Sequence, residues 1–121
     1  MFCDVVAGRS LANVRYEDED ILVFDNQLDW VPIMLLIIPK CHLTQIEFWR
    51  HPDLMLKATT IALSLGEDLA PSGFRVLSNF GKDAEQTQDH AHIHVIGGAY
   101  LGLYIDPVSY THLTLPTILL V

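Results

Sequence analysis

The strongest constraint on the fold is the alternating stretch at residues 90–96, which reads His-Ala-His-Ile-His-Val-Ile and is followed by two glycines. Alternation with a period of two predicts a β-strand, because successive side chains of a strand point to opposite faces. His90, His92 and His94 then share one face at intervals of about 7 Å, and the apolar residues between them share the other. We therefore expect a sheet with three imidazoles along one wall.

A chemical site is the better interpretation of this wall than a solvated strand face, although alternation by itself usually indicates the latter. Three consecutive outward histidines are an unusual choice for a solvated face. Imidazole can serve as a nucleophile or a proton donor near neutral pH. Neutral imidazole is also a common zinc ligand, so a metal site made by the same three histidines stays open.

The rest of the chain supplies partners for this strand. A buried strand is expected at 34–38, bracketed by Pro32 and Pro39, and further strands at 13–16, 21–25 and 74–79. A short amphipathic helix is expected at 2–7. The acidic run at 17–20 is interpreted as a solvated turn without a chemical role.

One long helix is expected at 53–69, with Asp53 as its N-cap or as an acid in its first turn. Its apolar residues recur at helical spacing, and they are Leu54, Ala58, Ile61, Ala62, Leu65 and Leu69. A meander of strands beside one helix predicts an α+β domain. We expect an antiparallel sheet of about five strands with one long helix and a short N-terminal helix.

Composition limits the partners and the compartment. The chain has 121 residues, enough for one domain, and a net charge of −8 with only seven basic residues, which are scattered. That balance argues against a nucleic-acid partner, which needs a clustered basic surface. The apolar run at 33–38 is too short to span a bilayer and the chain begins without a signal-peptide pattern, so no membrane role is expected. Two cysteines suggest no disulfide framework, and we expect a cytoplasmic protein.

Several motifs together resemble the histidine triad (HIT) nucleotide-binding family across residues 1–102. The triad His90-x-His92-x-His94 is the most specific of them. The run Ile-Ile-Pro-Lys-Cys-His at 37–42, then Asn79 and Gln86-Thr87, match the family in order and spacing. The resemblance implies the same α+β fold, a nucleotide substrate, and a homodimer whose sheet continues across the interface.

The resemblance also implies a role for each histidine. His92 matches the nucleophile that attacks the α-phosphate of a nucleotide derivative and forms a nucleotidyl-histidine, which water then cleaves. Such covalent catalysis divides one difficult displacement into two easier ones. His94 would stabilise charge on the phosphoryl group or protonate the leaving group. His90 would orient its neighbours rather than react.

Further positions match the family's substrate contacts. Gln86 and Thr87 match residues that contact the phosphate and the bridging atom, and Asn79 matches another residue of the site. Asn26 falls where many members carry an acid that binds the ribose hydroxyls, and an amide can also bond to hydroxyls. The apolar positions that align with the base pocket are Phe2, Val5, Phe24 and Leu36, although such residues are more often plain core.

Two residues depart from the family pattern. Met34 stands where many members have an additional histidine, so catalytic support from that side is missing. Glu85 replaces a small residue, usually glycine, beside the phosphate. A carboxylate there would repel an anionic substrate unless it points away or recognises a cationic leaving group.

A structural zinc site occurs in some bacterial relatives. It uses a Cys-x-x-Cys near the start, a histidine that matches His42, and a triad histidine that matches His90. Here Cys3 matches the second cysteine, but its partner would fall one residue before Met1. The site looks incomplete, so we expect no cofactor, with a structural zinc as the alternative.

The leading hypothesis is an enzyme that hydrolyses or transfers a nucleotidyl group, as a nucleoside phosphoramidase or a dinucleoside polyphosphate hydrolase. The first alternative is a nucleotide-binding module with little or no turnover, which Met34, Asn26 and Glu85 would explain. The second is a small metal-binding protein that uses the three histidines. In that case Asn79, Gln86 and Thr87 would match the family only by coincidence.

The end of the chain requires a separate interpretation. Residues 108–117 look like the in-frame translation of a transposase adapter used in preparing sequencing libraries. We therefore expect a HIT-like domain over 1–106 and a non-native tail over 107–121. His112 then has no functional role.

Overall fold

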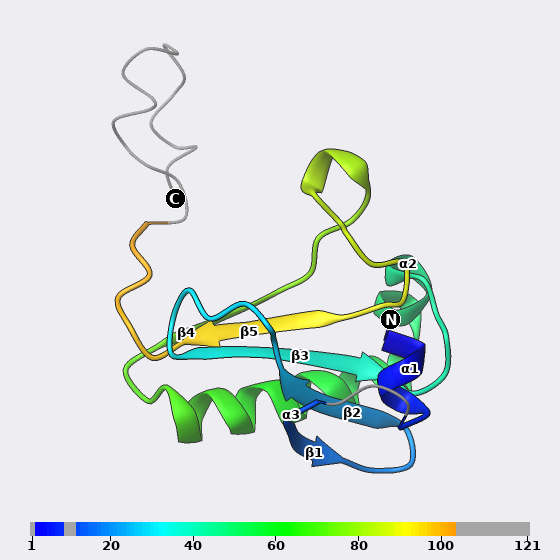
Figure 1. Cartoon of the computed structure of the whole chain (residues 1–121), viewed down its shortest axis with the longest axis horizontal. Helices are drawn as coiled ribbons and strands as arrows, with labels where there is room; N and C mark the ends of the chain where they lie inside the picture. The colour runs from blue at the N-terminus through cyan, green and yellow to red at the C-terminus, as the bar shows by residue number, and fades with distance from the viewer. Residues whose placement is uncertain (1, 9–11, 104–121) are drawn as a thin grey trace.

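The protein is described by a computed structural model that covers residues 2–8 and 12–103 (Figure 1). The elements in chain order are α1 (Phe2–Val6), β1 (Val14–Glu17), β2 (Ile21–Asp25), β3 (Ile33–Pro39), α2 (Gln45–Arg50), α3 (Pro52–Leu69), β4 (Phe74–Leu77), the short 3₁₀ helix η1 (Lys82–Ala84) and β5 (Ile93–Gly97). The predicted boundary at 106 and the tail lie outside the described residues and stay predictions. Within the described ranges, no helix is long and apolar enough to cross a membrane.

The five strands form one antiparallel sheet in the order β1-β2-β3-β5-β4. The predicted α+β class and antiparallel sheet are therefore confirmed. β3 lies at the centre and pairs with β2 on one side and β5 on the other, with Leu36 opposite His94. The edge strand β4 pairs with β5 and places Leu77 opposite His94 from the other side.

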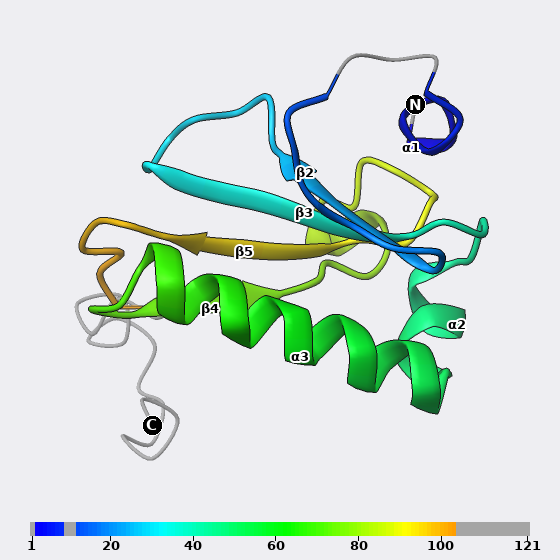
Figure 2. The ribbon, with the colours of Figure 1, turned by 90° about the horizontal axis from the view of Figure 1, so that it is seen from below.

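Different elements cover the two faces of the sheet. Figure 2 shows α3 along one face and α1 beside the other. The α3 face forms the larger core, and its strand residues are Ile21, Val23, Leu35, Ile37, Ile93 and Val95. On the α1 face, Phe2 packs with Leu22, Phe24, Leu36 and Ile38. Alternation along β5 then places His94 on the α1 face, because Ile93 and Val95 face α3.

The long helix follows its predicted pattern, since all six of its predicted apolar residues contact the α3-face core. Asp53 lies in the first turn, and the N-cap is His51, whose Nδ1 accepts the Leu54 N–H at 3.2 Å. Gly66 allows the close approach of β4, because a Cβ atom there would lie 2.4 Å from the ring of Phe74. The helix therefore packs against the sheet edge that precedes the histidine strand.

The helix α2 was not expected. Thr44 caps it, with its hydroxyl accepting the Glu47 N–H while the Glu47 carboxylate accepts the Thr44 N–H. This reciprocal capping box has the sequence signature Thr-x-x-Glu. The signature is present at 44–47 and could have predicted the helix.

The histidine strand starts later than predicted. β5 begins at Ile93, so the expectation of a strand over 90–96 is wrong for its first three residues. The β3–β5 pairing starts at Ile37 opposite Ile93. Before that point the Ala91 N–H donates to the carbonyl of Leu43 at 2.8 Å, so the chain leaves the ladder for the loop before α2.

The acidic run forms the predicted turn, but Asp18 is more than a solvated acid. Its carboxylate accepts the N–H groups of Asp20 and Ile21 at 2.8 and 2.9 Å and the hydroxyl of Tyr16 at 2.7 Å. Lys57 of α3 adds an ion pair at 3.0 Å. Burial raises the pKa of Asp18, but these hydrogen bonds outweigh it and hold the pKa well below its usual range. Asp18 therefore connects the β1–β2 turn to α3.

We predict that Asp18→Ala lowers the free energy of unfolding at pH 7 by about 1–3 kcal/mol, the cost of leaving hydrogen-bonding groups without a charged partner. Because the folded-state pKa lies below the unfolded value of about 3.9, the contribution is present above that value and is lost as the pH falls through the folded pKa. Urea unfolding at several pH values measures it. The exposed Glu19→Ala is the matched control, and an equal effect of both variants would contradict the assignment.

Candidate active site

His92 is fixed by its backbone and by its ring. Its N–H donates to Gln45 Oε1 at 2.9 Å, and its carbonyl accepts the Ser78 hydroxyl at 2.6 Å. Its Nδ1 lies 2.9 Å from the carbonyl oxygen of His90. Since a carbonyl only accepts, Nδ1 carries the proton and the lone pair is on Nε2. The side chain is therefore held in the tautomer that a nucleophilic Nε2 requires.

His92, just before β5, and His94, within it, lie side by side on the α1 face. The ring centroids of His92 and His94 are 5.1 Å apart, and the rings are close to perpendicular. Burial lowers the pKa of His92 and of His94, and the charge of His92 lowers that of His94 further. Both imidazoles are therefore neutral at neutral pH.

His90 is turned toward a different set of groups. Its Nε2 lies 2.7 Å from the carbonyl oxygen of Pro39, so Nε2 carries the proton and Nδ1 keeps its lone pair. That Nδ1 lies 3.3 Å from Cys3 Sγ, and Cys3 Sγ lies 3.3 Å from His42 Nδ1. In the described chain, Cys3, His42 and His90 are the three residues whose donor atoms gather closely enough to hold a metal ion, all within 4.8 Å of one another.

The predicted base pocket lies beside His92. The Phe2 ring centroid is 5.2 Å from that of His92 and 5.7 Å from that of Phe24. Phe2, Phe24 and Leu36 are buried in the same cluster, with exposed fractions of 3%, 4% and 5%. The structure thus brings three of the four predicted apolar residues to one wall next to the catalytic candidate. The side chain of Val5 lies outside the described residues.

The two predicted asparagines occupy different positions around this wall. Asn26 follows β2, and its Oδ1 accepts the Leu28 N–H at 3.1 Å in a local turn. Its backbone N–H donates to the Met34 carbonyl at 2.8 Å. Asn79 is half-buried beyond the end of β4, and its carbonyl accepts from Gln45 Nε2 at 3.0 Å.

The loop over 81–88 carries the two predicted phosphate contacts. Gln86 closes it, because Oε1 accepts the Gly81 N–H at 2.8 Å and Nε2 donates to the Gln88 carbonyl at 2.9 Å. Thr87 is exposed. Glu85 has a φ of 60° and is the one non-glycine residue of the described chain with positive φ. Glycine adopts that conformation readily, so a small residue would suit this position better than glutamate.

Met34 stands where the family resemblance predicts an additional histidine, and its side chain makes a structural contact instead. It lies on the same face of β3 as Leu36, two residues away. Its sulfur accepts the N–H of Trp30 at 3.2 Å, which ties the β2–β3 loop to the strand. The absent imidazole is thus replaced by an anchor for this loop.

Gln45 is the residue that the sequence interpretation missed. It is the first residue of α2 and is 2% exposed. Its amide bonds the backbone of His92 on one side and that of Asn79 on the other. A polar residue directly after the Thr44 cap was a usable signal, but its partners are 34 and 47 residues away.

Comparison with known proteins identifies the class. Residues 8–101 match the HIT domain family, so the chain belongs to that family, as the triad predicted. Protein HitA of Neisseria gonorrhoeae is 34% identical over 103 residues, covering 80% of this chain and 94% of that protein. The fold and domain are those of HIT family hydrolases.

Two solved structures show how closely the fold agrees. A HIT family hydrolase from Legionella pneumophila Philadelphia 1 superposes with a TM-score of 0.78 at 30% identity, over 86% of this chain and 96% of that one. A Zn-bound histidine triad family protein from Mycobacterium smegmatis superposes with a TM-score of 0.73 at 27% identity, over 88% and 81%.

We predict that Gln45→Met lowers the free energy of unfolding by about 2 kcal/mol or more. The substitution keeps the length of the side chain but removes both hydrogen bonds. The His92 N–H and the Asn79 carbonyl then lose their partner in a buried place. Urea unfolding measures the loss. The exposed Gln27→Met is the matched control. A loss no larger than that of the control would show that Gln45 does not support the site.

Proposed function

We propose that the protein is a hydrolase or transferase that acts on a phosphoramidate or phosphoanhydride of a nucleoside monophosphate through a nucleotidyl-histidine. The observation that carries the proposal is the hydrogen bond from His92 Nδ1–H to the His90 carbonyl. It leaves the Nε2 lone pair of a neutral, buried imidazole as the attacking group.

In the first step, Nε2 of His92 attacks the α-phosphorus and forms an N–P bond. The bond from phosphorus to the leaving nitrogen or oxygen breaks, and the leaving atom takes a proton. In the second step, a water oxygen attacks the same phosphorus, the N–P bond breaks, and the water's proton is released. The balance is one water consumed, with one nucleoside monophosphate and one leaving group released.

The neighbouring residues have distinct parts in this scheme. His94 lies next to His92 and donates an N–H to the phosphoryl oxygens; as an imidazolium, the form that the anionic substrate favours, it passes a proton to the leaving atom. His90 positions His92 through its backbone carbonyl. Its ring takes no part in the displacement.

The substrate contacts follow the same geometry. Phe2, Phe24 and Leu36 form the side of the site that would take the base. The part of Val5 in this wall stays a prediction. The Asn26 amide nitrogen would donate to the ribose hydroxyls, while its oxygen accepts the Leu28 N–H in the local turn. Thr87, Gln86 and Asn79 border the phosphate.

A binding module with little turnover is the competing function, and Met34 is the observation that favours it. Its sulfur is engaged by Trp30, so β3 offers the site no third imidazole. Tight binding of a nucleoside monophosphate without product release from any substrate would establish that alternative.

We predict that the protein releases adenosine monophosphate from adenosine 5′-phosphoramidate and that His92→Gly reduces kcat by at least about 10³-fold, because the covalent route is lost. Chromatography of the product measures both rates. Added imidazole should restore part of the His92→Gly activity, since it can enter the space of the missing ring and attack phosphorus.

The matched control is His51→Asn, which removes an imidazole but retains a side chain that can cap α3. It should keep the parent rate. Equal rates for the parent and the His92→Gly protein would contradict the nucleotidyl-histidine.

A zinc ion is the metal that fits the group formed by Cys3, His42 and His90. In tetrahedral zinc sites, sulfur and nitrogen ligands lie about 3.5 Å apart, and both Cys3–His distances are 3.3 Å. His90 also donates its other ring N–H to the Pro39 carbonyl, the support that metal-binding histidines usually have. We therefore adopt the alternative to the expected absence of a cofactor, and propose that these three residues hold a structural zinc that ties α1 to the start of the histidine stretch.

We predict that the purified protein binds about one zinc per chain and that Cys3→Ala abolishes this while Cys41→Ala does not, because both cysteines are exposed and free but only Cys3 belongs to the group. Metal analysis after dialysis measures the stoichiometry. Zinc should raise the melting temperature of the parent and not of Cys3→Ala. Equal zinc retention by the two variants would contradict the site.

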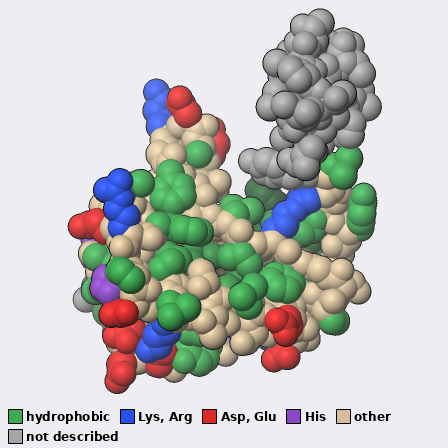
Figure 3. Space-filling model, turned by 180° about the vertical axis from the view of Figure 1, so that it is seen from behind, with side chains coloured by type: hydrophobic (Ala, Val, Ile, Leu, Met, Phe, Trp, Pro, Cys, Tyr) green, Lys and Arg blue, Asp and Glu red, His purple; other side chains and the backbone are tan. Residues whose placement is uncertain are grey.

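We also propose a homodimer built along β4. In the described sheet, β4 is an edge strand that pairs only with β5. Figure 3 shows apolar side chains gathered across the face seen from behind, and the exposed large apolar residues of α2 and α3 are Ile46, Trp49, Leu56 and Leu63. A second copy that continues the sheet would cover such a face. A cytoplasmic location stays an expectation.

A further inference from the structure

His90 connects the metal-binding group to the catalytic candidate. Its ring belongs to the metal-binding group, because its Nδ1 lies 3.3 Å from Cys3 Sγ. Its carbonyl oxygen belongs to the catalytic candidate, because it lies 2.9 Å from Nδ1 of His92. The ring and the carbonyl are parts of one residue, so a contact that fixes the ring also restricts where the carbonyl can lie.

The ring of His90 is held at both nitrogens when a metal is bound. Its Nε2–H donates to the carbonyl of Pro39 at 2.7 Å, and its Nδ1 is one of the three gathered donor atoms. The ring of His42 meets it nearly at a right angle, with centroids 4.9 Å apart. A thiol is only a weak hydrogen-bond donor, so Cys3 without a metal holds Nδ1 much less firmly. Metal occupancy therefore decides how rigidly His90 is placed.

The helix α1 adds a second connection through Phe2. It has five residues, far fewer than the roughly 12 that an isolated helix needs in water, so its position depends on tertiary contacts. Figures 1 and 2 show α1 beside the end of the sheet where β5 begins. The Phe2 ring centroid lies 6.1 Å from that of His90 and 5.2 Å from that of His92. A metal that holds Cys3, the next residue, therefore also holds Phe2 against His92.

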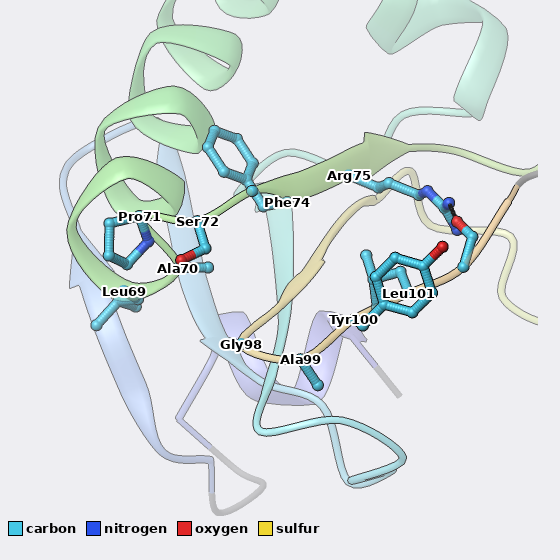
Figure 4. A pocket seen from close by; sticks show the side chains of 12 residues that line it. Leu69, Ala70, Pro71, Ser72, Phe74, Arg75, Gly98, Ala99, Tyr100 and Leu101 are labelled. Atoms are coloured by element: carbon cyan, nitrogen blue, oxygen red, sulfur yellow. Dashed lines mark hydrogen bonds between the residues drawn. The ribbon is translucent and has the colours of Figure 1, made fainter.

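The cavity at the other end of β5 is separate from these connections. Figure 4 shows it between the end of α3 and the segment with Tyr100 and Leu101. Its volume is about 640 Å³, and none of the histidines is among the described residues that line it. A ligand in that cavity would not contact the catalytic candidate, whereas a metal held by His90 acts two residues from His92.

We propose that Cys3 is a positioning residue for His92 and that zinc occupancy regulates the candidate active site through it. When zinc is bound, the fixed His90 carbonyl keeps the proton of His92 on Nδ1 and the lone pair on Nε2. When zinc is removed, His90 and α1 gain freedom and His92 populates its other tautomer. In that tautomer Nε2 carries the proton and cannot attack phosphorus. The inference rests on the structural zinc and on the nucleotidyl transfer proposed above.

The first readout is the tautomer of His92, measured by ¹⁵N NMR of histidine-labelled protein at about pH 8, where imidazoles are neutral. Protonated and unprotonated ring nitrogens have well-separated shifts, so the difference between Nδ1 and Nε2 measures the tautomer. We expect a large difference with one equivalent of zinc, a smaller one after a chelator removes it, and recovery when zinc is restored. His51 is the internal control, because its Nδ1 accepts the Leu54 N–H outside the metal-binding group.

The second readout is kcat/KM for adenosine phosphoramidate, measured well below the melting temperature of the zinc-free protein. We expect the zinc-loaded parent to exceed the zinc-free parent by about tenfold or more, as for other groups that orient a site. Cys3→Ala should show the zinc-free rate and tautomer whether or not zinc is added. Cys41→Ala is the matched control, because it removes the other exposed thiol and should keep the response of the parent.

A zinc that only stabilises the fold would raise the melting temperature and leave the ¹⁵N shifts of His92 unchanged, which would overturn the proposal. An equal response in Cys3→Ala, a protein that binds no zinc, or an unchanged kcat/KM in a protein that turns over substrate would also overturn it. Failure of the proposed function is separate, because it would show as no turnover by the zinc-loaded parent. In that case the ¹⁵N shifts alone support or overturn the role of Cys3.

Discussion

The site depends on how the backbone around His92 is held before β5 begins. His92 and His90 precede the strand, so no ladder hydrogen bonds fix them. Gln45 accepts the His92 N–H, Ser78 donates to its carbonyl, and the His90 carbonyl accepts from its ring. These contacts come from three separate parts of the chain, and together they set both the position of the imidazole and the nitrogen that carries the lone pair. In the proposed mechanism, an imidazole held in this way needs no rearrangement before it attacks.

The rest of the fold supports that arrangement from both faces of the sheet. Beneath it, α3 buries the apolar residues that alternate with the histidines, and α2 begins at the residue that holds His92. Above it, α1 places Phe2 against the rings of His90, His92 and Phe24. Cys3, the next residue, points to His42 and His90. One short helix thus supplies both an apolar wall and a thiol of the proposed zinc group.

The sequence was sufficient to predict the structure where a feature depends on neighbouring residues of the chain. The helical spacing from Leu54 to Leu69 predicted α3, and the alternation of residues 90–96 predicted β5 from Ile93 onward, because side-chain periodicity follows directly from backbone geometry. The sequence was insufficient where a residue's role depends on a partner far away along the chain. The roles of Gln45 and the turning of His90 toward Cys3 depend on partners 47 and 87 residues away, which no local pattern contains. For Asp18, the sequence predicted the turn in which it lies but not its ion pair with Lys57.

The measurement that tests the central claim most directly is mass spectrometry of the protein after rapid mixing with adenosine phosphoramidate and an alkaline quench, which preserves a phosphorus–nitrogen bond. The account predicts a nucleotidyl group on the peptide that contains His92, formed within one turnover and absent when that residue is glycine. Product release with the group on His94, or with no modified peptide under conditions that trap the intermediate of another HIT hydrolase, would contradict it.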